Sequence, residues 1–351
     1  MTKEYPSNES YRVHGLVNSK TACFSNAVLQ LLCSALTAAE TTMLRGESGA
    51  LAGLPECDDL LEYDSSEQLR TAGSKRLEAQ AGEIRAKLAQ DNSFVLAAYL
   101  GDVLNDMRTG IHNYSRLSAK LDKYVSPWVF QQAFAYGHGQ QRLHTFYDGR
   151  EQQCASDYLN MLLERLNKER PLISETFTAS FERYSECEGC SYQGSKTPEE
   201  QTSLDIFVTH KRGTKTLDEL IEQSLSSRLD GHECSKCKEI GTTVRHTTLT
   251  HLPRQLFINI RRLNNGVDKN TASVDVQPEE EVLVAETRYR LRGMIRHKGN
   301  ADGGHYTAFR EMDREWYHID DKYVSEVSVK KMKDHRRDGQ SAMVMLEKVE
   351  E

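Results

Sequence analysis

Two pairs of cysteines constrain the fold of this chain more than any other feature. Cys187 and Cys190 enclose two residues, and Cys234 and Cys237 repeat that spacing after a gap of 43 residues. Two such pairs can hold four thiolates tetrahedrally around zinc, at about 2.3 Å from the ion. Residues typical of strands precede the first pair and follow the second, over 242–250. We therefore expect a structural zinc ion at the end of a β-rich arm, with two disulfides or an empty site as the alternatives.

Composition limits the class of protein. A chain of 351 residues can form one large domain or two smaller ones. The net charge of −7 argues against a nucleic-acid partner, since such proteins present basic surfaces. No apolar run approaches the ~20 residues of a membrane helix, and Met1–Pro6 lacks the apolar core of a secretory signal.

Cysteine usage indicates the compartment. Eight cysteines in a chain of this length do not form a disulfide scaffold, and they fit a nucleophile, a metal site and buried thiols. We expect a reducing compartment, cytoplasmic or nuclear, although a protein exported into another cell's cytosol would have the same composition.

The distribution of apolar residues predicts an α+β fold, with helices in the first half and strands in the second. Helices are expected directly after Cys23, over 75–107 and over 154–166, and a loop over 46–74. Four short runs read as strands: 176–181, 203–208, 255–260 and 289–295.

Three residue types that suit nucleophilic catalysis occur in separate, ordered contexts. Cys23 lies where a buried helix is expected to begin, and a helix N-terminus favours the thiolate form. His305 follows two glycines almost three hundred residues later, and Asp320 and Asp321 come shortly after Trp316. A thiol, an imidazole and a carboxylate that meet in space would form a cysteine hydrolase.

These motifs together resemble the ubiquitin-specific proteases, a family of papain-like cysteine peptidases. The resemblance covers about residues 14–347. Five segments occur in the order that this family has: the Cys box from Gly15 to Gln30, the helix start from Gln152 to Leu159, the two cysteine pairs, the strand from Leu252 to Arg262, and the His box from His297 to Asp321.

The resemblance implies an arrangement in parts. Residues 1–13 are expected to be a flexible tail, and 14–351 a single catalytic domain. Within that domain we expect a helical thumb over 14–170 with an insertion near 37–110, a zinc-bearing β fingers arm over 171–250, and a β-rich palm with the His box over 251–351.

The resemblance also implies roles in catalysis. Cys23 is expected to attack a carbonyl, His305 to act as base and then acid, and Asp320 to orient the imidazole. Asp321 is expected to assist near the oxyanion. Thr21 stands where the family has an asparagine that donates to the oxyanion, and the loss of one such donor can lower a rate by ~10²–10³.

Five further residues are implied to bind an extended Gly-Gly tail: Gln153, Asp157, Gly303, Gly304 and Tyr306. The implied reaction is hydrolysis of the isopeptide bond after the C-terminal glycine of ubiquitin, and ubiquitin or ubiquitinated proteins are the implied partners. Cys154 replaces an acid that the family places opposite the arginines of the ubiquitin tail. Two alternatives therefore stay open: an isopeptidase for a ubiquitin-like modifier, and a catalytically weak ubiquitin-binding module.

Overall fold

The structure is a computed structural model of the chain. It describes residues 13–16, 18, 21–46, 96–109, 124–125, 130–131, 134–135, 152–209, 213–264, 268–300, 303–336 and 339–350. The predicted loop over 46–74 and the first part of the helix predicted over 75–107 lie outside these residues, apart from Gly46.

The chain divides into two compact units. The first contains residues 1–153 together with 319–325, and the second contains 154–318 together with 326–351. Strand β16 (Glu315–Asp320) leaves the second unit and enters the first, and β17 (Tyr323–Val327) returns to the second.

Three helices and a short parallel strand pair are described in the first unit: β1 (Gly15–Leu16), α1 (Cys23–Ala35), α2 (Ala38–Arg45), α4 (Leu96–Thr109) and β2 (Tyr124–Val125). Helix α1 is buried at all but one of its thirteen positions. A capping box starts α2, where Thr37 and Glu40 each bond the other's backbone N–H. Arg108 of α4 donates to the carbonyl of Cys33 at 2.6 Å, which satisfies a group at the end of α1.

Two carboxylates of α4 lie in the interior of this unit. Asp102 pairs with Arg45 at 2.6 Å, and Asp106 lies one turn further along the helix. Burial, assisted by the charge of Asp102, raises the pKa of Asp106 to about 7. The ionised form of Asp106 therefore opposes folding, because the unfolded chain solvates that charge better.

The largest sheet has eight strands in the order β17-β16-β15-β14-β18-β9-β5, with β13 also paired to β14. Its remaining members are β5 (Ser203–Phe207), β9 (Gln255–Arg261), β13 (Glu281–Val284), β14 (Thr287–Gly299), β15 (Gly304–Met312) and β18 (Ser341–Lys348). Most neighbours with a described register are antiparallel, whereas β5 and β9 are parallel. Strand β9 is buried at six of its seven positions, so the centre of the sheet is covered on both faces.

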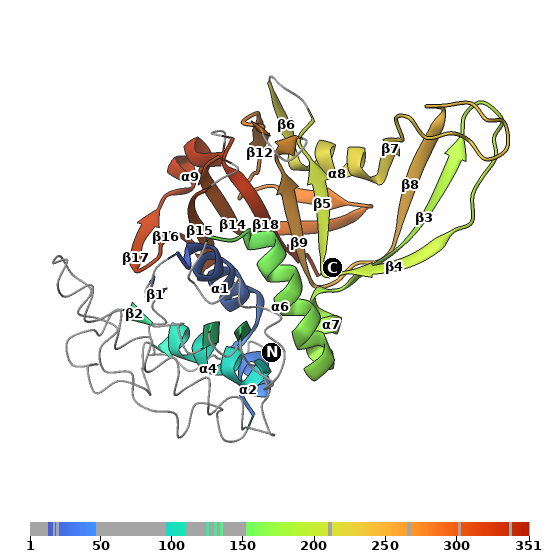
Figure 1. The fold of residues 1–351 in the computed structure, drawn as a ribbon. Coiled ribbons are helices and arrows are strands. Elements are labelled where there is room, and N and C mark those ends of the chain that lie inside the picture. The colour runs from blue at the N-terminus through green and yellow to red at the C-terminus, as the bar shows by residue number, and fades with distance from the viewer. Residues whose placement is uncertain are drawn as a thin grey trace. The chain divides into compact units, whose positions relative to one another are not determined.

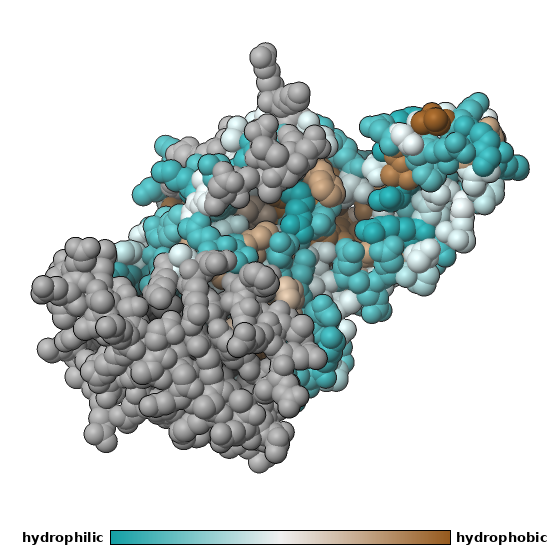
Figure 2. Space-filling view, viewed as in Figure 1, coloured by the Kyte–Doolittle hydropathy of each residue, from teal (hydrophilic) through white to brown (hydrophobic). Residues whose placement is uncertain are grey.

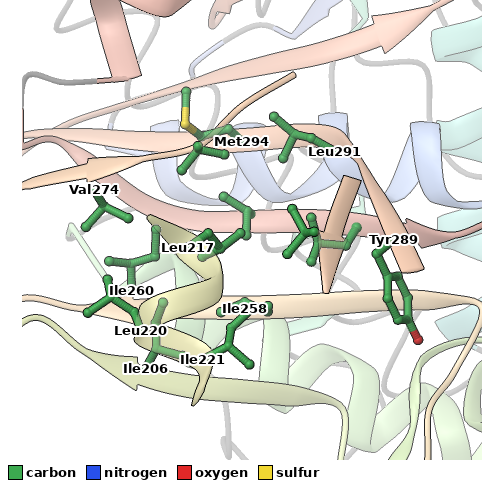
Figure 3. Close-up of a cluster of buried hydrophobic side chains, with 14 of the residues drawn as sticks. Ile206, Leu217, Leu220, Ile221, Ile258, Ile260, Val274, Tyr289, Leu291 and Met294 are labelled. Atoms are coloured by element: carbon green, nitrogen blue, oxygen red, sulfur yellow. The ribbon is translucent and has the colours of Figure 1, made fainter. Parts of the chain in front are cut away.

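Helix α8 (Leu217–Leu225) supplies much of the core beside this sheet. A capping box of Thr216 and Glu219 begins it. Its buried face, Leu217, Leu220 and Ile221, lies among aliphatic side chains of the sheet strands (Figure 3). Helices α6 (Ala155–Glu169), α7 (Pro171–Phe177) and α9 (Val329–Arg336) complete the described helices of this unit.

A second, four-stranded sheet forms the arm labelled β3, β4, β7 and β8 in Figure 1. Its order is β4 (Thr197–Gln201), β3 (Ala179–Cys187), β8 (Thr243–His251) and β7 (Ser226–Arg228), all antiparallel. Short pairs also join β6 (Thr214–Thr216) to β12 (Ser273–Asp275), and β10 (Leu263–Asn264) to β11 (Asp268–Lys269).

The expected α+β fold is confirmed, and one strand was placed wrongly. Thr176 and Phe177 end helix α7 instead of opening a strand, because Pro171 starts a helical turn there and the strand begins at Ala179. No single helix among the described residues is long and apolar enough to cross a bilayer. Helices α1 and α2 taken together are long and apolar enough to do so, by length and composition only, and they are bent by 115° at the break between them.

Replacement of Asp106 by asparagine should stabilise the protein at high pH. The wild-type carboxyl has a folded pKa of about 7 against an ordinary value of 3.8, so its ionisation weakens the fold as pH rises between these values. Asp106→Asn should therefore have a higher unfolding temperature than wild type at pH 8, and this advantage should vanish near pH 4. Calorimetry at several pH values measures it. A difference that does not change with pH would contradict the raised pKa.

Candidate active site and metal centre

Cys23 is the first residue of helix α1. The residue is 2% exposed, and Ala22 at the helix boundary makes no side-chain cap. The thiol therefore lies at the positive end of the helix, where the first N–H groups have no partners within the helix. The predicted position of Cys23 at the start of a buried helix is confirmed.

The segment before this helix is held by one carboxylate. The side-chain amides of Asn18 and Asn26 donate to the two oxygens of Asp321, at 2.9 and 2.8 Å. Asn18 also accepts from the backbone N–H of Ala22 at 2.9 Å, directly before Cys23. These contacts connect residues about 300 positions apart, so Asp321 fixes the turn that leads into α1.

Backbone contacts strengthen the same junction. The N–H of Leu16 donates to the carbonyl of Asp321 at 2.9 Å. A side chain at Gly15 would collide with the backbone of Lys322, so only glycine permits this approach. Further along α1, Gln30 donates to the carbonyl of His14 at 2.9 Å. Asn18, Asn26 and Gln30 of the Cys box thus each support the start of the helix through hydrogen bonds.

The other predicted residues of the first unit lie at several places. Thr21 is half-buried in the turn two residues before Cys23, Asp320 ends strand β16 and is also half-buried, and Gln153 lies just before helix α6. Asp321 has a left-handed backbone, with φ of 50°. Its carboxylate is bonded by two amides and supports the Cys box, and its role near the oxyanion stays a prediction.

His305 lies on strand β15 of the second unit. In the register of β14 and β15, His305 is opposite Lys298, Gly304 is opposite Gly299, and Tyr306 is opposite His297. Gly303 precedes this strand and donates its N–H to the side chain of Asn300 at 3.1 Å. The predicted tail-binding residues of the His box therefore lie together at the end of one antiparallel pair.

The start of helix α6 carries the other predicted tail contact. Asp157 lies in the first turn and pairs with Arg261 at 3.5 Å, and Arg261 also bonds Asp205 at 3.0 Å. Cys154 occupies the N-cap, where burial raises the pKa of its thiol, so it is held as a neutral thiol. The helix start thus offers one carboxylate, and that carboxylate already has a basic neighbour.

Four cysteines meet at the end of the arm. The Sγ atoms of Cys187 and Cys237 are 3.6 Å apart, those of Cys190 and Cys234 are 3.8 Å apart, and all four lie within 4.8 Å of one another. All the cysteines that the structure describes are free, and a disulfide would bring two sulfurs to about 2.05 Å. A tetrahedral ion with bonds of about 2.3 Å requires sulfurs about 3.8 Å apart. The four thiols therefore fit a tetrahedral metal ion.

The two cysteine pairs have the same backbone geometry. Ser191 and Lys238, each directly after a second cysteine, have positive φ of 54° and 65°. Their N–H groups donate to the carbonyls of Cys187 and Cys234, at 2.7 and 3.0 Å.

The hydroxyl of Thr242 lies 3.3 Å from Cys187 Sγ, and this hydrogen bond lowers the pKa of Cys187 to about 6. Backbone hydrogen bonds also lower the pKa of Cys234, whereas burial and the neighbouring sulfurs raise the pKa of Cys190 and of Cys237. The site thus favours a thiolate at only two of its four cysteines.

The surface near the cysteine cluster is mostly hydrophilic, with an apolar spot at the end of the arm (Figure 2). Tyr192 and Ile240, which follow the two cysteine pairs by a few residues, are 40% and 65% exposed.

Comparison with known proteins gives the family. The sequence profile described as "Ubiquitin carboxyl-terminal hydrolase" matches residues 14–346, nearly the whole chain. The chain belongs to the ubiquitin carboxyl-terminal hydrolase family. This match includes Cys23, His305 and Asp320 as well as the four clustered cysteines.

Individual members of the family are distant in sequence. The chain is 25% identical over 361 residues to a "Probable ubiquitin carboxyl-terminal hydrolase FAF" of Drosophila melanogaster, with 89% of this chain and 12% of that protein covered. It is 28% identical over 176 residues to "Ubiquitin carboxyl-terminal hydrolase 5" of Saccharomyces cerevisiae, with 42% and 22% covered. The chain thus spans a small fraction of the length of these relatives.

Solved structures confirm the fold of the family. A structure of the SAGA Ubp8/Sgf11/Sus1/Sgf73 DUB module bound to ubiquitin aldehyde matches with a TM-score of 0.63 and 16% identity, covering 99% of this chain and 72% of that one. A structure of the yeast SAGA DUB module with a mutant Sgf73 matches with a TM-score of 0.60 and 16% identity, covering 97% and 70%.

Sequence reasoning gave no role to several residues that support the site. Asn18 and Asn26 are in the Cys box, but only the structure identifies Asp321 as their common acceptor. Thr242 lies five residues after Cys237, and no local pattern distinguishes it from its neighbour Thr243. Contacts between distant segments leave no signal in a single sequence.

Removal of the Asp321 carboxylate should destabilise the Cys box. Asp321→Ala leaves two amides without their charged acceptor, which should cost about 2–4 kcal/mol of unfolding free energy. Asp313→Ala is the matched control, because Asp313 has nearly the same backbone, with φ of 53°, and is exposed. Both variants carry the same backbone penalty, so their difference in a urea titration measures the amide contacts. Equal losses would refute the role of the carboxylate.

Proposed function

We propose that this chain is a thiol-dependent deubiquitinase that hydrolyses the isopeptide bond after the C-terminal glycine of ubiquitin. One observation carries the proposal: the family profile spans residues 14–346 and includes a cysteine at a helix N-terminus, a histidine after two glycines and a following acid pair. Ubiquitin and ubiquitinated proteins are the proposed partners. The ubiquitin aldehyde bound in one structure of similar fold supports the same class of ligand.

The proposed reaction has two steps. The thiolate of Cys23 attacks the carbonyl carbon of the terminal glycine while His305 gives a proton to the departing lysine amine, which leaves a thioester. His305 then takes a proton from water, the hydroxide attacks the thioester carbonyl, and the thiolate is released with the modifier's free carboxylate. Asp320 keeps the imidazole in its useful tautomer.

A modifier other than ubiquitin is the second candidate. At the start of helix α6 a cysteine replaces one acid, and the remaining Asp157 already pairs with Arg261. This arrangement is less anionic toward a basic tail, which favours a ubiquitin-like protein with fewer arginines near its C-terminus. A panel of modifiers, each with an electrophile at its C-terminus, compares the two candidates by labelling rate.

The same reagent tests the nucleophile. A ubiquitin probe with a C-terminal electrophile should label the wild-type protein covalently and should not label Cys23→Ala, although this variant should still bind ubiquitin. Cys33→Ala is the matched control, because Cys33 is a buried thiol on the same helix and should leave labelling unchanged. Labelling or turnover by Cys23→Ala would exclude Cys23 as the nucleophile. Ubiquitin binding by a wild type that is not labelled would favour the catalytically weak module.

Thr21→Asn tests whether the oxyanion site limits the rate. If the Thr21 hydroxyl only partly replaces an amide donor, asparagine should raise kcat by up to about 10²-fold. KM should change little, because the donor acts mainly in the transition state. Steady-state kinetics on a ubiquitin C-terminal amide substrate measure both constants. An unchanged kcat in a folded variant would show that other donors already complete the site.

We propose that zinc is the ion that suits the four cysteines and that it has a structural role. The sulfur spacing and the four-thiolate donor set support zinc, and four protein ligands leave no open position for a reacting water. Free thiols at this site require reducing surroundings, so the proposal includes a cytoplasmic or nuclear location.

Two adjacent threonines give a matched test of the metal site. Thr242→Val removes the hydroxyl 3.3 Å from Cys187 Sγ, and the loss of such an outer contact should weaken zinc binding about 10–100-fold. Thr243→Val is the control, because the buried Thr243 hydroxyl has no hydrogen-bond partner in the described part of the chain. Competition with a chromophoric chelator measures both affinities. Equal affinities would contradict the role of Thr242, and metal analysis without zinc would refute the proposed ion.

A further inference from the structure

Lys269 connects two segments next to the His box. It ends strand β11, which pairs with β10 after the central strand β9. Its Nζ lies 3.3 Å from Nδ1 of His297 and 3.3 Å from the carbonyl oxygen of Gly299, and it also donates to the carbonyl of His297. All three acceptors are at the end of β14, directly before the turn that leads to His305.

These contacts determine the state of the His297 ring. An ammonium has three donors and no acceptor, so Nδ1 of His297 must accept and the ring proton must lie on Nε2. Burial, together with the charges of Lys269 and His305, lowers the pKa of His297 to about 4. Burial and the nearby Arg262 and Arg296 lower the pKa of Lys269 to about 8, which leaves the ammonium predominant at pH 7. The pair is therefore a cation and a neutral imidazole in one fixed tautomer.

The His297 ring in turn supports both neighbours of His305. Its centroid lies 4.5 Å from that of Tyr306, with 35° between the two planes. A Cβ on Gly304 would lie 2.5 Å from Nε2 of His297, so the ring lies directly against the glycine backbone. Gly304 and Tyr306 are the residues proposed to line the channel for a Gly-Gly tail.

The residues that follow β11 do not depend on Lys269 for their attachment to the large sheet. The buried guanidinium of Arg262 donates to the carbonyls of Ser341, Asn270 and Ala272, at 2.6, 3.1 and 2.7 Å. These bonds join the residues after β11 to strand β18 whether or not Lys269 is present. The contacts of Lys269 itself are to the end of β14 and to the His297 ring.

We propose that Lys269 and His297 are positioning residues for the modifier's tail: Lys269 fixes the tautomer and orientation of His297, and the His297 ring holds Tyr306 and the Gly304 backbone against the tail. The part that concerns the tail rests on the proposed function. The part that concerns the ring stands on contacts within one unit of the protein.

The kinetic test compares Lys269→Met with Lys330→Met. Methionine keeps the unbranched stem and removes the three donors, and Lys330 is an exposed lysine of helix α9. On a ubiquitin C-terminal amide substrate, Lys269→Met should raise KM about tenfold and change kcat less than about threefold, since tail binding is weakened more than the chemical step. Lys330→Met should match wild type. An unchanged KM, or a loss confined to kcat, would overturn the proposal.

A spectroscopic test does not need activity. In protein with ¹⁵N-labelled histidine, the wild-type His297 ring should show one neutral tautomer with the proton on Nε2, assigned by its absence in His297→Asn. Lys269→Met should give a mixture of tautomers and a ring that titrates at higher pH. Unchanged ring shifts in Lys269→Met would refute the positioning of His297. If wild type fails to cleave ubiquitin substrates, the proposed function fails, and these shifts still decide the role of Lys269.

A double-mutant cycle tests whether the effect passes through Tyr306. If it does, Lys269→Met should raise KM much less in a Tyr306→Ala background than in wild type. Equal effects in both backgrounds would show that Lys269 acts independently of Tyr306. That result would overturn the proposed effect of Lys269 on Tyr306 through the His297 ring. Unfolding temperatures of the single variants show whether a fold change accompanies either result.

Discussion

A single carboxylate organises the segment that leads to Cys23 at the start of helix α1. The two oxygens of Asp321 accept from Asn18 and Asn26, and its backbone carbonyl accepts from Leu16, so three separate donors of the Cys box depend on one residue. Hydrogen bonds to a charged acceptor are stronger than those between neutral groups. The carboxylate also sits on a backbone with positive φ, which is unfavourable for a residue other than glycine.

Arg262, directly before β10, and Lys269, at the end of β11, bond mainly to backbone carbonyls. Arg262 is buried, and its described hydrogen bonds all go to backbone carbonyls. Lys269 makes two contacts of the same kind at the end of β14. Carbonyl dipoles accept from Nε and Nη1 of Arg262 and from Nζ of Lys269 without neutralising either charge, so this region stays positive. A positive region beside a histidine favours its neutral form, and the lowered pKa of His297 agrees with that.

Sequence patterns predicted the helices and strands that are determined by the residues of a single segment. The stripe after Cys23 gave helix α1, and the apolar run of Gln255–Arg261 gave the buried strand β9. The spacing of the cysteine pairs predicted a four-sulfur cluster, which the structure contains. Helix α8 was missed although Thr216 and Glu219 form a capping box that marks its start, because strand-like residues surround it. The parallel pairing of β5 with β9 and the acceptor shared by Asn18 and Asn26 could not be predicted, since both depend on contacts between distant segments.

The position of Asp321 in the chain also sets the order in which the protein can be completed during synthesis. Asn18 and Asn26 are translated about 300 residues before their acceptor. At 5–20 residues per second this interval lasts about 15–60 s. During that time helix α1 can form, but the turn before Cys23 lacks the carboxylate that fixes it. The segment Ile319–Ser325 joins the first unit only after most of the second unit has been synthesised. A nascent chain therefore carries the Cys23 thiol through this interval without the carboxylate that completes the Cys box.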